Sequence, residues 1–243
     1  MAPMRCFAVL ATSLMLTSLP SLADDVIHVS YSERPPYLLP QPDGSPAGLT
    51  GAPAVAAFKA AGIPVEWLKV PSNRQLALVK DPHGLNCTVG WFAMPERSMY
   101  AKFTKPIYRD KSWMLLTNAG FAARGITSMG ELAAHSDIRV LVKDNFSYAG
   151  LDKFIQKWQP VVAVSTAPTV KMIQSVAKGA VDMMFVSEEE GNYILKHEAG
   201  ELSANLRLLS LKDMPRGPER HIMCSKAVPD EIINRLNKAI TFK

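Results

Sequence analysis

The first half of the chain alternates short apolar runs with segments of helical periodicity. Apolar and β-branched runs typical of strands cover residues 26–31, 65–70 and 85–90. Residues 48–61 carry apolar side chains at helical spacing and stop before Gly62, and Ser72 is placed to cap a second helix over 73–80. This order, with short links, predicts a right-handed parallel α/β layer, in which ligands bind at the carboxyl ends of strands.

The pattern restarts after residue 118, which indicates a second α/β unit. Further strand-like runs cover residues 112–118, 138–142, 161–165, 181–186, 206–211 and 221–225. Helical patterns cover residues 129–135, a segment ending near 158, residues 169–178, a segment opening at 187, and a final segment that begins at Pro229. From Asp24 onward the chain is long enough for two domains of about 100 residues each.

The first residues have the pattern of an export signal. Arg5 supplies a positive start, residues 6–16 are apolar but too few to span a bilayer, and small residues at Ser21 and Ala23 flank a cleavage site after Ala23. Residues 1–23 are therefore predicted to be a signal peptide. No later stretch approaches the ~20 consecutive apolar residues of a membrane helix.

A candidate ligand anchor lies in the stretch from Asn86 to Tyr108, which reads as a strand, a turn at Pro95-Glu96-Arg97, and a second aromatic run. Arg97, flanked by Trp91 and Phe92, offers a planar fork of donors that matches a carboxylate. The alternative for Arg97 is a surface ion pair that shapes the turn. Tyr37 follows an extended, stiff loop at Pro35-Pro36 and also comes after a strand end, so both side chains are expected on one edge.

Composition and charge exclude little beyond nucleic-acid binding and metal sites. The formal net charge of +5 is mild, and no Lys/Arg block with interleaved aromatics is present. The five histidines are scattered and no His/Cys/Asp cluster has metal-ligand spacing, so neither a metal nor a cofactor is expected. In an exported chain Cys87 and Cys224 suggest one disulfide, provided that their Cα atoms come within about 7 Å.

Several marks in order make the chain resemble the bacterial extracellular solute-binding proteins of the amino-acid-binding type, family 3, the periplasmic receptors of ABC importers. The marks are Pro35-Pro36-Tyr37 after the first strand, Asp43-Gly44 before Gly48-Leu49, Pro95-Glu96-Arg97 before residues 103–108, Gly179-Ala180-Val181-Asp182, and the passage from Ser225 to Leu236. The resemblance implies a type II periplasmic-binding-protein-like α/β fold with two lobes joined by two crossover strands. Lobe 1 would comprise 24–115 and 213–243, and lobe 2 would comprise 116–212.

The resemblance also implies roles for individual residues. It sets the strand of Cys87 beside that of Cys224, which makes their disulfide plausible. It gives Arg97 the α-carboxylate of the ligand, and Tyr37 a place over the ligand's side chain. Donors at a helix start in lobe 2 would assist Arg97, and these would be Asn145, Phe146 and Ser147.

Two departures from the family pattern leave the ligand open. Relatives have a Ser or Thr shortly before the Arg, where this chain has Gly90, Trp91 and Phe92. Relatives place an Asp for the ligand's α-amino group where this chain has Ser187, although Glu188 or Glu33 could replace it. The ligand can thus be an amino acid, a plain carboxylate, or an aromatic compound stacked on Trp91, Phe92 and Tyr148.

The resemblance predicts a monomeric periplasmic protein that closes about a hinge over a small solute and delivers it to a membrane ABC permease, without catalysis. One alternative is a periplasmic enzyme similar to the cyclohexadienyl dehydratases, with Glu33 or Glu188 as general acid. Another is an accessory or sensor protein whose cleft is vestigial. No G-x-S-x-G motif or comparable hydrolase pattern is present.

Overall fold

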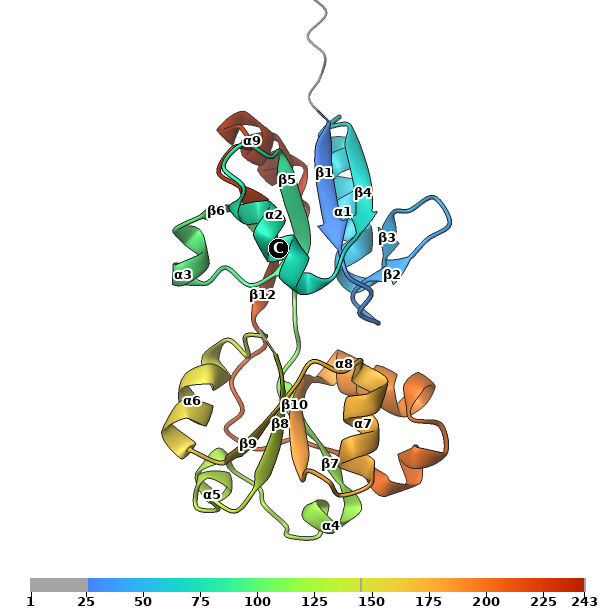
Figure 1. Cartoon of the computed structure of the whole chain (residues 1–243), viewed down its shortest axis with the longest axis vertical. Coiled ribbons are helices and arrows are strands. Elements are labelled where there is room, and N and C mark those ends of the chain that lie inside the picture. Colours follow the sequence, from blue (N-terminus) through green and yellow to red (C-terminus); the bar gives the residue numbers. More distant parts are fainter. Residues whose placement is uncertain (1–25, 145, 243) are drawn as a thin grey trace, which may run out of the picture.

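Two five-stranded sheets divide the chain into two lobes stacked along its long axis (Figure 1). The computed structural model describes residues 26–144 and 146–242. The predicted signal peptide, residues 1–23, lies outside the described residues. Within them, no helix is long and apolar enough to cross a membrane.

The sheet of lobe 1 has the strand order β4-β1-β5-β12-β6. Its strands are β1 Ile27–Tyr31, β4 Val65–Lys69, β5 Asn86–Trp91, β6 Ala101–Arg109 and β12 Glu219–Ser225. Strand β1 is parallel to β4 and β5, whereas β12 runs antiparallel to β5 and β6. The other elements of this lobe are the short strands β2 Leu39–Pro40 and β3 Pro46–Ala47, and the helices α1 Gly48–Ala60, α2 Ser72–Lys80, α3 Pro95–Ser98 and α9 Asp230–Ala239.

The sheet of lobe 2 has the strand order β11-β7-β10-β8-β9. Its strands are β7 Trp113–Asn118, β8 Arg139–Lys143, β9 Val161–Ser165, β10 Met183–Ser187 and β11 Leu206–Leu209. Its helices are α4 Ala119–Ala122, α5 Met129–Ala133, α6 Gly150–Trp158, α7 Thr169–Ala177 and α8 Glu188–Tyr193, followed by the π-helix η1 Ile194–Glu198 and the 3₁₀-helix η2 Gly200–Asn205. Separate apolar clusters fill each lobe. The predicted two-lobed α/β fold is confirmed.

The chain crosses between the lobes twice, between β6 and β7 and again between β11 and β12 (Figure 1). Strand β7 belongs wholly to lobe 2, because Trp113 already pairs with Ser187 of β10. Lobe 2 therefore begins at Trp113, ahead of the boundary at 116 that the resemblance implies.

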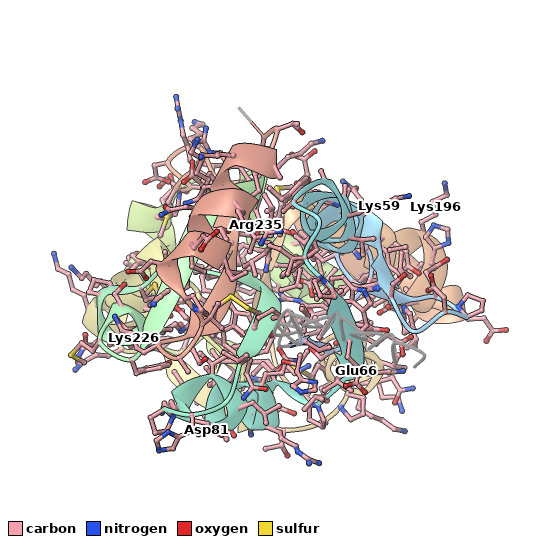
Figure 2. The ribbon with its side chains drawn as sticks, turned by 90° about the horizontal axis from the view of Figure 1, so that it is seen from above. Lys59, Glu66, Asp81, Lys196, Lys226 and Arg235 are labelled. Atoms are coloured by element: carbon pink, nitrogen blue, oxygen red, sulfur yellow. A yellow bond between two sulfur atoms is a disulfide. The ribbon has the colours of Figure 1, made fainter. Side chains whose placement is uncertain are left out.

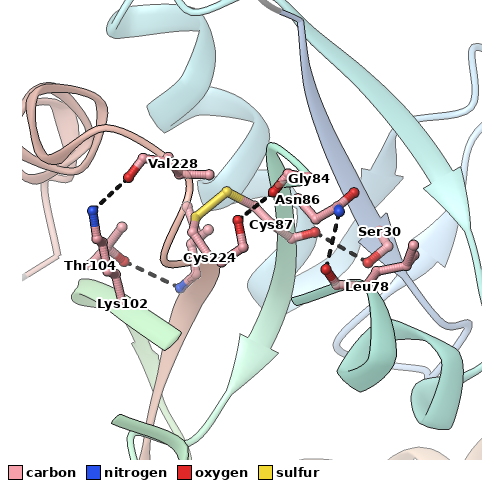
Figure 3. Close-up of a disulfide and its surroundings, with 11 residues drawn as sticks. Ser30, Leu78, Gly84, Asn86, Cys87, Lys102, Thr104, Cys224 and Val228 are labelled. Atoms are coloured by element: carbon pink, nitrogen blue, oxygen red, sulfur yellow. Dashed lines mark hydrogen bonds between the residues drawn. A yellow bond between two sulfur atoms is a disulfide. The ribbon is translucent and has the colours of Figure 1, made fainter. Parts of the chain in front are cut away.

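Cys87 and Cys224 form the predicted disulfide, with their Cα atoms 4.0 Å apart. The two cysteines are directly paired in the β5–β12 ladder, which places the bond inside the sheet of lobe 1 (Figure 3). Viewed from above lobe 1, the sulfur–sulfur bond lies inward of labelled charged residues such as Lys226 and Glu66 (Figure 2). The bond attaches the returning C-terminal segment to the N-terminal part of the lobe.

Three local predictions were wrong in detail. Pro95–Ser98 forms one turn of helix rather than a plain turn. Ser72 is the first residue of α2 and Pro71 stands at its N-cap position, so Ser72 does not cap the helix. The Pro35-Pro36 loop folds back instead of extending, because Arg34 and Leu38 form an isolated bridge and the amides of Tyr37 and Leu38 both donate to the Arg34 carbonyl.

Candidate functional site

Strand β5 ends at the wall of a pocket that faces lobe 2. Its last residue, Trp91, donates from Nε1 to Gln75 Oε1 at 3.1 Å and to Thr88 Oγ1 at 2.9 Å. Gln75 in turn donates to the Val70 carbonyl at 2.6 Å, which ties the indole to α2 and the end of β4. Hydrogen bonds to Gln75 of α2 and Thr88 of β5 thus hold the indole ring in one orientation.

Arg97 on α3 points back into this pocket. Its side chain is 8% exposed, its Nη1 donates to the Phe92 carbonyl at 3.1 Å, and its Cζ lies 4.9 Å from the centre of the Trp91 ring. Burial lowers the pKa of the Arg97 guanidinium, which nevertheless stays charged because its ordinary pKa is so high. Among the residues that the structure describes, no carboxylate forms an ion pair with Arg97. The pocket therefore holds a buried cation that no described carboxylate pairs directly, although the charges of Glu96 and Asp152 act on it from further away.

A second arginine, Arg220 of β12, is buried beneath the same pocket. Both of its Nε and Nη2 donors lie 2.6 Å from the carboxylate of Asp110, and its Nη1 donates to the Gly90 carbonyl. Its Cζ lies 3.9 Å from the centre of the Tyr37 ring and 4.7 Å from that of Phe92. Burial alone would lower the pKa of Arg220, but the Asp110 carboxylate raises it overall. Arg220 thus supports both aromatic rings while its charge is neutralised.

A third arginine, Arg34, connects lobe 1 to lobe 2. It forms a bidentate ion pair with Glu190 of α8, with Nε–Oε1 at 3.1 Å and Nη2–Oε2 at 2.8 Å. Next to it, the hydroxyls of Tyr37 and Ser187 lie 2.5 Å apart across the lobes. Ser187 also accepts from the Glu190 amide, so it caps α8 and orients the acid.

The pocket that contains Arg97 has a cavity volume of about 60 Å³, and both lobes line it. Apolar side chains include Leu38, Val89, Trp91, Phe92 and Phe146. Polar groups come from Thr50, Gln75, Ser32, Ser72 and Ser147, together with the three arginines. No described residue of this lining is acidic.

The predicted site residues divide into two groups. The structure brings Arg97, Tyr37, Trp91, Phe92 and Ser147 together in this lining. Ser147 comes from the loop before α6, where its hydroxyl donates to Asp152 at 2.6 Å and accepts from the Ala149 amide. The helix itself begins later, at Gly150. Asn145 lies outside the described residues.

The remaining predicted residues lie outside that lining. Glu33 binds Lys69 at 2.6 Å and Glu188 binds Lys111 at 2.9 Å, in both cases as partly exposed pairs. Tyr148 lines a neighbouring pocket, where burial raises its pKa to about 12 and its hydroxyl accepts from the Lys143 amide. Ser187, as described, bonds to Tyr37 instead of lining the pocket.

Sequence reasoning missed Arg34, Arg220, Gln75 and Thr50 as pocket residues. Arg34 lies between Glu33 and Tyr37, which are both predicted site residues. Its position just after the first strand therefore points to the same edge of the sheet. Arg220 reaches the pocket only through the pairing of β12 with β5. Within the described residues, no group of three or more His, Cys, Asp or Glu side chains could hold a metal ion.

No family model matches the chain, and no curated protein matches it either. Solved structures do. The periplasmic VFT2 domain of BvgS from Bordetella pertussis is 20% identical with a TM-score of 0.67, over 88% of this chain and 86% of that chain. The chain has the type II periplasmic-binding-protein fold.

Two further neighbours are amino-acid-binding proteins. An ancestral arginine-binding protein bound to arginine is 17% identical, with a TM-score of 0.66 over 88% of this chain and 90% of that one. The amino acid ABC transporter substrate-binding protein AbpA from Streptococcus pneumoniae Canada MDR_19A, bound to L-arginine, is 16% identical, with a TM-score of 0.65 over 88% and 86%. At these identities the likeness establishes a shared fold.

Proposed function

We propose that this protein binds a small carboxylate-bearing solute between its lobes, with Arg97 as the group that receives the carboxylate. The observation that carries the proposal is the buried guanidinium of Arg97, which lines the pocket and has no carboxylate partner among the described residues. A charged donor fork in a largely desolvated pocket binds a carboxylate with two parallel hydrogen bonds, among the strongest that side chains form.

The walls of the pocket support capture by closure. Trp91, Phe92 and Tyr37 provide aromatic surface from lobe 1, and Phe146 and Ser147 approach from lobe 2. A solute that contacts both lobes binds the closed arrangement more tightly than the open one. That difference in affinity shifts the protein toward the closed arrangement, as in hinge-closing receptors. The acids proposed for a dehydratase, Glu33 and Glu188, are paired with lysines and lie outside this lining, which favours binding over catalysis.

The wider role follows from the same reasoning. We place the protein in the periplasm, exported by residues 1–23 and cleaved after Ala23, acting as a monomer with a membrane ABC permease as its partner. The support is the signal-like composition of those residues and the fold shared with ABC transporter substrate-binding proteins. The two lobes, 24–115 with 213–243 and 116–212 except that Trp113–Leu115 pair in the sheet of lobe 2, would then move about the two crossings.

Thermal unfolding of the purified protein in the presence of small carboxylates tests the proposal. A ligand at a hundredfold excess over its Kd adds about 2.7 kcal/mol to the free energy of unfolding. Arg97→Gln should weaken binding by about thirtyfold or more, since truncating one partner of a buried charge pair costs about 2 kcal/mol at least.

Arg74→Gln is the matched control, because Arg74 is an exposed arginine of the same lobe outside the pocket lining. The control should bind as the unmodified protein does. Equal affinities for the two variants would contradict the role of Arg97. A panel of amino acids and plain carboxylates that leaves the melting temperature unchanged would contradict solute binding itself.

A further inference from the structure

The charges that face the interlobe pocket have one sign. Arg34, Arg97 and Arg220 all line it, and the described residues of its lining include no aspartate or glutamate. Two of these arginines are neutralised by Glu190 and Asp110, and Arg97 is not. A ligand in the pocket therefore meets a positive field.

Most acidic side chains near the cleft are already engaged, and the buried Oε2 atoms of Glu189 and Glu198, which have no hydrogen-bond partner among the described residues, belong to residues outside the pocket lining. Both oxygens of Glu190 accept from Arg34, and Glu190 is buried. The other pairs are Glu188 with Lys111 and Glu33 with Lys69. Asp144, on the rim of the polar pocket next to Phe146, is not free either. An ammonium group inside the pocket therefore meets no free carboxylate among the described residues that line it.

A second cation without an ion pair stands on the opposite lobe. Lys143, the last residue of β8, lines two pockets adjacent to the first, together with Arg34 and Phe146. Its Nζ lies 5.3 Å from the centre of the Phe146 ring, and none of the described acids lies within ion-pair distance of it. Lys143 thus adds a second cation, unpaired by any described acid, beside the pocket on the side of lobe 2.

Most neutral acceptors in the pocket already make one hydrogen bond, and the Thr50 hydroxyl donates its proton to the Tyr37 carbonyl. Gln75 Oε1 accepts from Trp91 and Thr88, and the Gly90 carbonyl accepts from Arg220. The Ser32 and Ser72 hydroxyls lie 3.2 Å apart and bond to each other. A buried ammonium needs acceptors for three protons, and the described lining offers it only neutral oxygens and no carboxylate to compensate its loss of water.

We propose that the ligand is a net anion with an apolar body and no ammonium group: a plain, hydroxy- or keto-carboxylate rather than an α-amino acid. The inference rests on the proposed function and specifies the class of solute for the same pocket. Arg97 receives the carboxylate, and the body lies against Trp91, Phe92 and Phe146. Arginine, the ligand of two structural neighbours, does not fit a pocket of this charge.

Calorimetric titration of the unmodified protein with matched ligand pairs tests the proposal. Each pair differs only by the α-ammonium: phenylalanine with 3-phenylpropionate, leucine with 4-methylpentanoate, and tryptophan with indole-3-propionate. The carboxylate without ammonium should bind at least about tenfold more tightly in the pair whose body fits best, a difference of about 1.4 kcal/mol. The uncharged amide 3-phenylpropionamide should lose that affinity, because it lacks the negative charge.

The outcomes separate the two proposals. An amino acid that binds as tightly as its partner without ammonium overturns the ligand class and leaves solute binding intact. An amide that binds as tightly as the acid also overturns the ligand class. If no member of any pair binds, both proposals fail. Arg97→Gln should abolish the preference for the acid over the amide, and Arg74→Gln should retain it, which assigns the preference to this pocket.

Discussion

Arg34 of lobe 1 and Glu190 of lobe 2 hold the lobes together through two parallel hydrogen bonds, Nε–Oε1 at 3.1 Å and Nη2–Oε2 at 2.8 Å. The Arg34 guanidinium also lies over the ring of Phe146, at 4.6 Å. Since the partners belong to different lobes, the pair stabilises the arrangement seen here over one in which the lobes move apart. This ion pair therefore biases the equilibrium between open and closed forms.

Glu190→Gln should shift that equilibrium toward the open form. The amide keeps the size of the side chain but removes the charge, and leaves Arg34 without a counter-ion in the closed cleft. Small-angle X-ray scattering should show a larger radius of gyration for the variant. Glu188→Gln is the control, because its pair with Lys111 is partly exposed and worth about 0–1 kcal/mol. Equal radii for both variants would contradict the role of Glu190.

Acidification should open the protein in the same way. Burial alone would raise the pKa of Glu190, but the charges of Arg34, Arg220 and Lys143 hold it below its ordinary value. A lowered pKa in the closed form means that the pair is fully present above the ordinary glutamate pKa, about 4.3, and is lost as the pH falls through the lowered value. The radius of gyration, followed from about pH 6 downward, should rise only below about pH 4.3. Glu190→Gln should lack this step.

The sequence predicts the fold better than it predicts the site. Local periodicity places helix α7 and strand β9 almost to the residue, because each is specified by its own apolar pattern. The pocket depends on contacts that no local pattern contains. Arg220 reaches the carbonyl of Gly90 across 130 residues, and Glu190 reaches Arg34 across 156.

The site residues of lobe 2 depart from the family pattern. That pattern expects an aspartate at the position of Ser187, whereas Ser187 caps α8 and bonds with Tyr37. The buried acid that reaches lobe 1 is Glu190, one helical turn further on, and the half-buried Glu189 reaches it through the Tyr108 hydroxyl. A run of three glutamates at a helix start gives no sequence signal for which one is buried.

Loss of the disulfide should destabilise lobe 1 without changing ligand affinity. The bond closes a loop of 137 residues, for which the chain-entropy model gives about 5 kcal/mol. The bond joins β5 to β12 inside one lobe, so it leaves the movement between lobes free (Figure 3). Chemical unfolding of the Cys87→Ala, Cys224→Ala double variant should show this loss. The unmodified protein under reducing conditions should approach the same stability, and a loss below about 1 kcal/mol would contradict the prediction.

Asp110→Asn should be among the most damaging single changes near the pocket. Arg220 is 3% exposed, and its Nε and Nη2 atoms donate to the two oxygens of the Asp110 carboxylate. The variant therefore leaves an uncompensated charge beneath Tyr37 and Phe92. Removing one partner of a buried ion pair costs about 3–5 kcal/mol. The free energy of unfolding in urea measures this cost.

Glu219→Gln is the matched control for that change, because the partly exposed Arg109–Glu219 pair lies one residue away from Asp110 and Arg220 on both chain segments. Partly exposed pairs contribute about 0–1 kcal/mol, so this variant should stay close to the unmodified protein. If both variants lose the same free energy of unfolding, the cost of Asp110→Asn does not come from the burial of Arg220, and the prediction is contradicted. If only Asp110→Asn also weakens carboxylate binding, the buried pair positions the aromatic wall of the pocket, since Arg220 lies directly against both rings.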